Sequence, residues 1–537
     1  MIALRRQQIG RGQQSRVKAN WTGGAIMSEA YELELRGITK RFGDTLANDH
    51  VSFCVRRGEV HALIGENGAG KSTLMNILYG MLRPDAGEIL WRKKPLSLRS
   101  PRDAITKGIG MVHQHFMLAP SLTVAENIAL GHPPAKGPFW KPKELRRRVE
   151  LLQNDYGVEL PLDAPVRDLT VGLMQRVEIV KTLYRGAEVL ILDEPTAVLT
   201  PQESVELFAT IRRLTAAGRT VIFISHKLRE VLDISDRITV LRAGKTVGTV
   251  DKTQVTAAQL AQMMIGRPLA GLGRGESKTG EAVLEADNLC VAGDLGTTAV
   301  DAVSFSVRAG EILGVAGVEG NGQTELAEAI IGVRRPLSGH IRLLGERADG
   351  RPVDKRLNAG LAIIPQDRVK EGLALNFSIT DNVILHMRGA PPISHHGVID
   401  WKAAGRAGAE MVRDYAIKAP SAGELCGNLS GGNMQKVVVA RELSKKPKVV
   451  IACQPTRGVD IGASEYIRKM LLKMRDEGSA VLLISADLDE IMELSDRIMV
   501  MYGGKKSGEL ASGQANEQIL GRMMFGETVR ESAGDAV

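Results

Sequence analysis

The stretch Gly65-Glu66-Asn67-Gly68-Ala69-Gly70-Lys71-Ser72 decides the fold of the first part of this 537-residue chain. It has the full pattern of a phosphate-binding loop, preceded by an apolar run at 61–64 that favours a buried strand and followed by helix-forming residues. The glycines let backbone amides point at a β-phosphate, Lys71 brings a positive charge to the β- and γ-phosphates, and Ser72 offers a hydroxyl to Mg²⁺. The predicted nucleotide-binding residues are Gly65, Glu66, Asn67, Gly68, Ala69, Gly70, Lys71, Ser72 and Thr73.

A second apolar strand, at 189–192, ends in a pair of carboxylates, Asp193 and Glu194. A carboxylate at the end of a buried strand is costly unless it meets a cation, so we assign Asp193 to Mg²⁺ and Glu194 to polarising the attacking water. Taken alone, an Asp-Glu pair after a strand is as often simply the start of a helix. The phosphate-binding loop favours the functional interpretation.

Three isolated residues complete the predicted site. His226 follows the strand at 221–225 and could reach a γ-phosphate, although a lone histidine there is more often structural. Gln114 follows another apolar stretch and could join Mg²⁺ or the water while sensing a partner. Phe42 could stack on adenine, but an aromatic core residue is an equally good explanation. The predicted catalytic residues are Lys71, Gln114, Glu194 and His226, and the predicted metal ligands are Ser72, Gln114 and Asp193.

The chain contains an internal duplication. Val51-Ser52-Phe53 recurs 252 positions later as Val303-Ser304-Phe305, and Ser235-Asp236-Arg237-Ile238 recurs 260 positions later as Ser495-Asp496-Arg497-Ile498. The eight extra residues of the second copy are expected after Gln366, in a stretch read as mainly helical, because surface connections absorb insertions easily.

The duplication predicts two similar domains, at residues 31–266 and 282–527, joined by a flexible linker at 267–281. In each half a β-rich opening leads to a strand, a glycine-rich loop and a helix, then to a helical region and further buried strands. That alternation indicates an α/β fold with a parallel sheet, a β subdomain and a helical insertion. Residues 1–30 are expected to be a disordered basic extension and 528–537 a tail.

Charge and composition exclude several classes of protein. The formal charge is +8, but residues 1–26 contain five basic and no acidic residues, so the remainder is nearly neutral and a nucleic-acid partner is not expected. The basic segment is interpreted as the product of a translation start upstream of Met27 or, alternatively, as a tail that contacts the membrane. We find no uncharged apolar run long enough to cross a bilayer. The four cysteines lack Cys-x-x-Cys spacing, which fits a reducing cytosol.

Together with the phosphate-binding loop and the carboxylate pair, Leu429-Ser430-Gly431-Gly432-Asn433 resembles the ABC ATPase family. The hallmark of that family is a Leu-Ser-Gly-Gly-Gln signature, and the resemblance covers both halves, from residue 31 to about 527. In this family two domains pack head to tail, so that each ATP lies between one phosphate-binding loop and the opposite signature. The resemblance therefore implies that Ser430, Gly431, Gly432 and Asn433 contact bound nucleotide.

The two halves differ in their chemistry. Neutral residues occupy four positions of the predicted site in the second half, where Gln323, Cys453, Gln454 and Ala486 replace Lys71, Asp193, Glu194 and His226. In the first half, Val171 replaces a signature glycine whose backbone must come close to phosphate. Under head-to-tail pairing, the sound residues of the first half and the sound signature of the second meet in one site, with Asp460. The other site collects every defect.

This arrangement looks like the fused ATPases of the simple-sugar and nucleoside importers. Stretches at 111–118, 175–186 and 195–203 look more like the purine-nucleoside branch, so nucleoside import is expected, with monosaccharide import as the alternative. The resemblance implies ATP and Mg²⁺ as cofactors, two transmembrane permease subunits docked near Gln114 and Gln366, an indirect substrate-binding lipoprotein partner, and a peripheral place on the cytoplasmic face of the membrane. Soluble tandem ABC proteins that act on ribosomes are a distant alternative, because they typically have two competent sites and a long charged linker.

Overall fold

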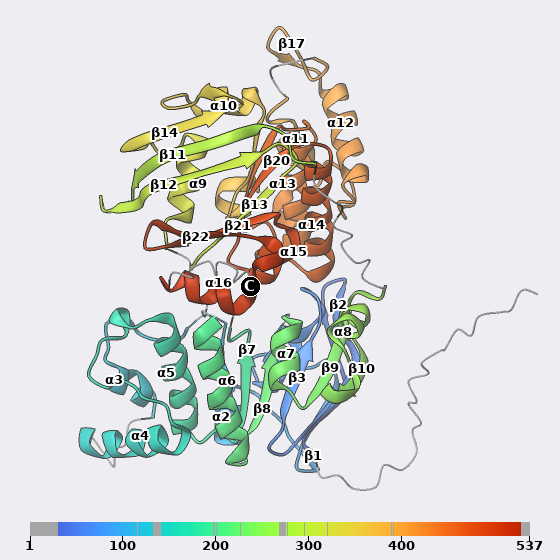
Figure 1. Cartoon of the computed structure of the whole chain (residues 1–537). Coiled ribbons are helices and arrows are strands. Elements are labelled where there is room, and N and C mark those ends of the chain that lie inside the picture. The colour runs from blue at the N-terminus through green and yellow to red at the C-terminus, as the bar shows by residue number, and fades with distance from the viewer. Residues whose placement is uncertain are drawn as a thin grey trace, which may run out of the picture. The chain divides into compact units, whose positions relative to one another are not determined.

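The computed structural model describes residues 31–114, 116–132, 141–196, 199, 201–225, 227–267, 275, 278–294, 296–318, 320–387, 389 and 391–527 (Figure 1). The predicted extension at 1–30, the predicted tail at 528–537 and most of the predicted linker lie outside the described residues, as does His226. The chain divides into two compact units. One comprises the described parts of Met1–Val198 and Glu206–Met264, and the other those of Leu199–Val205 and Ile265–Val537.

The first half is built on two sheets. Four antiparallel strands pair in the order β2-β1-β4-β5, and a larger sheet has the order β10-β9-β3-β8-β7-β6, in which every pairing except β10 with β9 is parallel. The strands are β1 (Tyr31–Phe42), β2 (Thr45–Arg56), β3 (Val60–Ile64), β4 (Ala86–Trp91), β5 (Lys94–Pro95), β6 (Ile109–Val112), β7 (Val189–Asp193), β8 (Thr220–Ile224), β9 (Arg237–Arg242) and β10 (Lys245–Asp251). The helices are α1 (Lys71–Leu78), α2 (Pro101–Thr106), α3 (Val124–Ala129), α4 (Pro142–Tyr156), α5 (Val171–Tyr184), α6 (Pro201–Ala216), α7 (Leu228–Ile234) and α8 (Ala257–Ile265).

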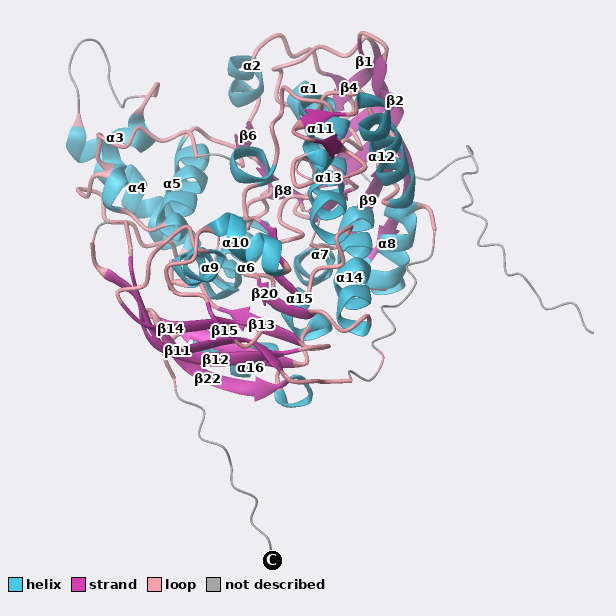
Figure 2. Cartoon of the chain, turned by 90° about the horizontal axis from the view of Figure 1, so that it is seen from above, coloured by secondary structure: helices cyan, strands magenta, loops and turns pink. Residues whose placement is uncertain are grey.

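The second half repeats this plan, with sheets ordered β12-β11-β14-β15 and β16-β19-β20-β13-β21-β22. Its strands are β11 (Ala282–Ala292), β12 (Thr298–Arg308), β13 (Ile312–Ala316), β14 (Ser338–Leu343), β15 (Glu346–Arg347), β16 (Leu361–Ile364), β17 (Ser394–His395), β18 (Val398–Ile399), β19 (Val449–Cys453), β20 (Ala480–Ile484), β21 (Arg497–Tyr502) and β22 (Lys505–Ala511). Its helices are α9 (Gln323–Ile331), α10 (Val353–Ala359), α11 (Ile379–Ile384), α12 (Trp401–Asp414), α13 (Gly431–Leu443), α14 (Ile461–Asp476), α15 (Leu488–Leu494) and α16 (Glu517–Met524). Figure 2 shows β22 beside β12, where the edge of the core sheet meets the β subdomain.

The central strands of both halves are buried along their whole length. In each half one face of the core sheet packs against the β subdomain and the helix that follows the glycine-rich loop, and in the second half the other face packs against α13, α14 and α15. All five residues of β3, of β8, of β13 and of β20 are buried, and their sequences are almost continuously apolar. Such runs are typical of parallel sheets, which lack a solvent-facing side. The predicted α/β fold, with a β subdomain and a helical insertion in each half, is confirmed. Among the helices of the described residues, none is both long and apolar enough to cross a membrane.

The repeated Ser-Asp-Arg-Ile motif is structural. Asp236 accepts a hydrogen bond from the Val60 N–H at 2.8 Å, and Asp496 accepts one from the Ile312 N–H at the same distance. Each aspartate therefore fixes the first residue of the strand that leads into a glycine-rich loop. The arginine that follows pairs with a buried glutamate in both halves, for example Arg497 with Glu311 at 2.6 Å.

The eight extra residues of the second half lie in two places. The helices α3 and α11 begin after capping boxes at Thr123 and Ser378, which are 255 positions apart, so three of the extra residues precede Ser378. There the chain forms a π-helical turn, η3 (Arg368–Gly372). The other five follow Ser378, in a connection that includes the β17–β18 hairpin. As predicted, the extra residues lie after Gln366 in connections of a mainly helical stretch, where they form a turn and a hairpin.

Candidate nucleotide-binding site

The phosphate-binding loop connects β3 to α1 and depends on its glycines. A Cβ at Gly65 would lie 2.4 Å from the Leu241 carbonyl oxygen, and one at Gly70 would lie 2.3 Å from the Ala47 carbonyl oxygen. Gly70 also has φ 95°, a left-handed conformation that side chains disfavour. The loop can therefore keep its backbone amides accessible only with glycine at these positions.

The Lys71 side chain is buried inside its own loop. Its Nζ donates to the carbonyl oxygens of Gly65 at 2.6 Å and Glu66 at 3.0 Å. Burial lowers the pKa of Lys71, while the charges of Glu194, Asp193 and Glu66 oppose that shift. The ammonium is thus partly desolvated and is held ready for an anion at the mouth of the loop.

The predicted carboxylates lie beside this lysine, at the end of β7. Burial raises the pKa of Asp193 and the nearby charge of Glu194 raises it further, whereas Lys71 lowers it. Two adjacent carboxylates and one buried lysine leave the cluster short of positive charge. The structure therefore brings Lys71, Asp193 and Glu194 together, in an arrangement that a further cation would stabilise.

Glu194 has an unusual backbone and a defined partner. Its φ is 46°, and its N–H donates to the Ile224 carbonyl oxygen at 3.0 Å. Gln114, from the turn after β6, donates through Nε2 to the Glu194 carboxylate at 3.3 Å. Two residues 80 positions apart in the sequence therefore meet at the carboxyl end of the parallel sheet.

The remaining first-half residues lie at the rim of this cluster. Ser72 is exposed on the first turn of α1, and Thr73 is half-buried. Phe42 is 47% exposed at the end of β1, with the Lys40 ammonium 5.7 Å from its ring centroid. Phe42 is therefore not the core aromatic that was its alternative explanation. His226 lies outside the described residues.

The predicted signature begins a helix in the second unit. Ser430 is the N-cap of α13, and its hydroxyl oxygen accepts from the Asn433 N–H at 3.5 Å and from Asn433 Nδ2 at 2.9 Å. A Cβ at Gly432 would lie 2.7 Å from Asp460 Oδ2, so the start of α14 packs directly against this turn. In the first half, Thr170 caps α5 and Val171 is 37% exposed. The predicted residues thus form two groups, one in each unit.

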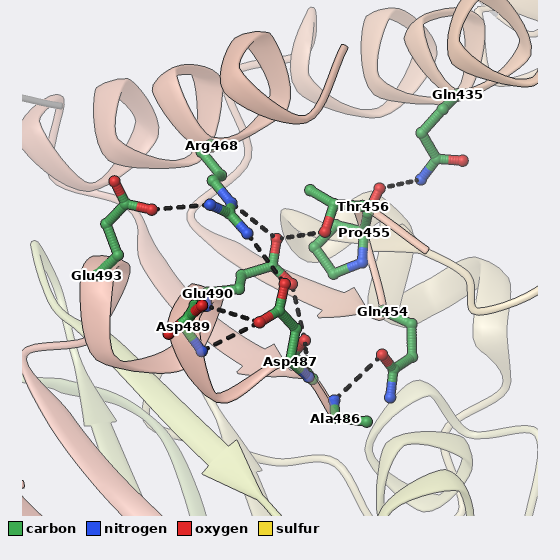
Figure 3. A network of polar contacts seen from close by, with 11 residues as sticks. Gln435, Gln454, Pro455, Thr456, Arg468, Ala486, Asp487, Asp489, Glu490 and Glu493 are labelled. Atoms are coloured by element: carbon green, nitrogen blue, oxygen red, sulfur yellow. Dashed lines mark hydrogen bonds and ion pairs between the residues drawn. The ribbon is translucent and has the colours of Figure 1, made fainter. Parts of the chain in front are cut away.

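The residues of the second half that are equivalent to Lys71, Asp193 and Glu194 have a similar backbone conformation but uncharged side chains. Gln323 is buried and donates to the Val318 carbonyl oxygen at 3.2 Å. Burial raises the pKa of the Cys453 thiol to about 12, so the thiol stays neutral at physiological pH. Gln454 has φ 47°, and its side-chain oxygen accepts from the Ala486 N–H at 3.1 Å (Figure 3).

Beside Gln454 lies an ion-pair network that the sequence reasoning missed. Figure 3 shows the Arg468 guanidinium between Asp487, Glu490 and Glu493, at 3.1, 3.6 and 2.8 Å. Glu490 is fully buried and also accepts from the hydroxyls of Thr456 and Ser485. The duplication offset of 260 places Phe208 at the position of Arg468, and that mismatch is the signal that could have revealed the network.

Comparisons with known proteins agree with the duplicated plan. The family described as ABC transporter matches residues 48–197 and 300–457. The nucleoside import ATP-binding protein NupA of Lactococcus lactis subsp. cremoris is 43% identical over 94% of this chain and 100% of its own length. The guanosine import ATP-binding protein NupO of Bacillus subtilis is 43% identical over 94% and 99%. The glucose import ATP-binding protein TsgD13 of Haloferax volcanii is 43% identical over 92% and 96%.

Proposed function

The chain belongs to the ABC transporter family, and on that premise we propose that it binds and hydrolyses ATP to power the import of nucleosides. The observation that carries the hydrolytic part is the cluster of Lys71, Asp193 and Glu194 at one end of the first-half sheet. A buried ammonium, a half-buried carboxylate and a second carboxylate bonded to Gln114 are the groups that phosphoryl transfer to water requires.

In the proposed reaction, the loop amides and Lys71 hold the β- and γ-phosphates. Glu194 accepts a hydrogen bond from the attacking water and orients it, while Gln114 fixes the carboxylate of Glu194. His226 would contact the γ-phosphate and Phe42, which is exposed, would stack on adenine. The residues Gly65 to Thr73 would line the phosphates.

The oxygen donors of Ser72, Gln114 and Asp193 fit Mg²⁺, which supplies charge neutralisation on the phosphates when it is bound. Among the described residues, no group of three or more His, Cys, Asp or Glu could hold a metal ion by itself. The remaining ligands of a magnesium ion would come from nucleotide phosphates and water. The raised pKa of Asp193 also favours a cation at this place, because a nearby cation would stabilise the charged form of the carboxyl.

We further propose that the complete site is shared between the two halves. Ser430, Gly431, Gly432 and Asn433 would face the ATP held by Lys71, in head-to-tail pairing of domains bounded at 31–266 and 282–527. The distribution of defects supports this pairing, because the half that lacks catalytic residues keeps the sound signature. The second site would bind nucleotide without hydrolysing it or bind none.

The partners we propose are two permease subunits and, through them, a substrate-binding lipoprotein, which would place the chain at the cytoplasmic face of the membrane. A pocket lined by Tyr79, His113 and Met117 lies beside Gln114, and Met117 is 63% exposed, as a docking surface requires. The three relatives are all named as import proteins, which favours a transporter over a ribosome-associated ATPase.

The hydrolytic proposal is tested by Lys71→Ala, with Lys94→Ala as the matched control because Lys94 is exposed on a short edge strand. Lys71→Ala should lose ATP binding and turnover together, whereas Lys94→Ala should retain both. Unchanged nucleotide affinity in Lys71→Ala would remove the role given to that residue.

The cargo is tested separately, by reconstitution with the permease subunits and measurement of the uptake of a labelled nucleoside. Nucleosides should compete for uptake, and monosaccharides should not. Competition by glucose or ribose alone would support monosaccharide import instead. This alternative is tested because the glucose import protein TsgD13 is as similar to this chain, at 43% identity, as the two nucleoside import proteins are.

A further inference from the structure

The turn after Gln366 contains an arginine that the proposed reaction does not use. Arg368 begins η3, and Asp367 caps that turn by accepting from the N–H groups of Val369 at 2.9 Å and Lys370 at 3.1 Å. The Arg368 side chain leaves the turn and reaches the loop after β19. Its Nη1 donates to the Arg457 carbonyl oxygen at 2.7 Å and its Nη2 to the Gly458 carbonyl oxygen at 3.1 Å.

The same guanidinium lies against the signature. A Cβ at Gly431 would be 2.7 Å from Arg368 Nη2 and 3.3 Å from the Gly458 carbonyl oxygen. The loop that Arg368 holds leads directly to Asp460, which caps α14 and lies 2.7 Å from a Cβ built at Gly432. One side chain therefore joins three elements, the turn after Gln366, the loop after β19 and the signature.

This contact is not an ordinary salt bridge. Burial lowers the pKa of Arg368, and among the described residues the one charge that acts against this shift is Asp367, which is already bonded to the turn. The Arg368 Nε is buried without a hydrogen-bond partner. Leaving a half-buried guanidinium without a facing carboxylate costs stability, and geometry that serves function commonly explains such a cost.

The first half lacks both members of the contact. Its residues 116–122 contain no arginine after Gln114, and Val171 occupies the position of Gly431. A valine at 431 would occupy the space of the Arg368 guanidinium, so the arginine and the glycine belong together. The arginine is therefore absent from the half in which valine replaces the signature glycine.

We propose that Arg368 is a positioning residue that couples the turn after Gln366 to the second-half signature, so that events at Gln366 reach the ATP held by Lys71. This inference rests on the shared site proposed above. It predicts that Arg368 affects turnover and its stimulation, and leaves ATP affinity alone, because the side chain acts through the loop at 457–458 and the signature.

The experiment uses the full chain reconstituted with its permeases and binding protein, and compares Arg368→Met, Arg368→Lys and Lys370→Met. Lys370 is the matched control, since its side chain is 82% exposed on the same turn. Arg368→Met should lower kcat on the order of tenfold and abolish stimulation by loaded binding protein, with KM for ATP unchanged. Arg368→Lys should behave like Arg368→Met because an ammonium cannot bond two carbonyls in a fixed fork. Lys370→Met should match the wild type.

Three results would overturn the inference. Wild-type turnover and stimulation in Arg368→Met would show that the contact is inert. A raised KM with unchanged kcat would place Arg368 on the nucleotide, and full rescue by lysine would show that charge alone matters. If Arg368→Met does not fold, Arg368→Gln replaces it, because its side-chain amide keeps one hydrogen-bond donor group. Arg368→Gln should show a kcat between those of Arg368→Met and the wild type. A wild-type kcat in Arg368→Gln would also refute the coupling. Ser430→Arg in the same preparation separates the two proposals, because retained hydrolysis in that variant would refute the shared site itself.

Discussion

The ends of β7 and β19 share a backbone and differ in charge. Glu194 and Gln454 have φ angles of 46° and 47°, and each donates its N–H to the neighbouring strand, at 3.0 Å to Ile224 and 2.7 Å to Ile484. Gly70 and Gly322 likewise have φ angles of 95° and 94°. The left-handed turn therefore belongs to the fold and persists where no catalysis is expected. Geometry alone does not identify an active half.

The first half retains charged side chains whose burial reduces the stability of the fold. Burial acts against the charged forms of both Lys71 and Asp193, as their shifted pKa values show. In the second half Gln323 and Cys453 remove those charges, and Gln454 bonds to the Ala486 backbone instead. Groups that destabilise a folded protein are commonly those that serve its function.

The sharpest way to break the comparison is to place the same cation at both signatures. Ser430→Arg should abolish hydrolysis, because under the proposed pairing the bulky cation would lie beside the γ-phosphate of the ATP held by Lys71. Thr170→Arg should reduce hydrolysis far less, since under the proposed pairing Thr170 would face the defective site. Steady-state phosphate release from permease-bound, equally folded variants measures both. If Thr170→Arg were the more damaging change, the pairing would be reversed.

Exchanging the residues at the two strand ends gives the next largest effect. Glu194→Gln should leave ATP binding largely intact and lower turnover by a factor on the order of 10². The reciprocal Gln454→Glu should add no second activity, because the second half would still lack a lysine and a metal carboxylate and catalytic groups act as a unit. Nucleotide affinity and phosphate release separate binding from turnover. A doubled rate in Gln454→Glu would contradict the comparison.

The Arg468 network offers a test through stability. Arg468→Phe installs the residue found at the equivalent first-half position and leaves Glu490 buried without its cation, at a cost of about 3 kcal/mol. The pKa of Glu490 is already raised, chiefly by burial, and Arg468 lowers it, so the variant should raise it further. A raised carboxyl pKa destabilises only where the unfolded carboxyl is ionised. The deficit should therefore grow from pH 4 to pH 7.5.

Calorimetric unfolding across that pH range measures the deficit of Arg468→Phe. The control is Arg413→Phe, which removes an arginine whose side chain is 72% exposed and paired with its neighbour. It should change stability little at any pH. A pH-independent loss in Arg468→Phe would mean that packing rather than charge is responsible.

The smallest expected effect comes from rebuilding one charge of the second half. Cys453→Asp should destabilise that half by about 2 kcal/mol near neutral pH, since the new carboxylate would be buried with no lysine nearby. Adding Gln323→Lys should recover part of the loss, because the pair would then resemble Lys71 and Asp193. Denaturant midpoints of the single and double variants test this coupling. Strictly additive losses would show that the two positions do not interact.

The sequence predicted most of the first-half cluster because short motifs with fixed spacing carry it. The loop glycines, Lys71 and the carboxylates after β7 follow from strand order alone, since parallel strands bring their carboxyl ends to one edge. The contact of Arg368 with residues 457–458 could not be predicted in this way, because it joins positions about 90 apart through one side chain. The π-helical turn and the hairpin of the second half were also missed, since their short lengths leave no periodicity to detect.

The capping boxes at Thr123 and Ser378 have a consequence for how such chains diverge. Each cap forms an isolated β-bridge to the far end of its helical segment, Thr123 to Pro165 and Ser378 to Leu425, and further backbone hydrogen bonds join the chain on either side of each bridge. A segment whose two ends are held together in this way can change length or be replaced without moving the strands outside it. The helical segments therefore behave as exchangeable modules, and recombination between duplicated halves at these bridges would alter the helices while the sheet beneath stays intact.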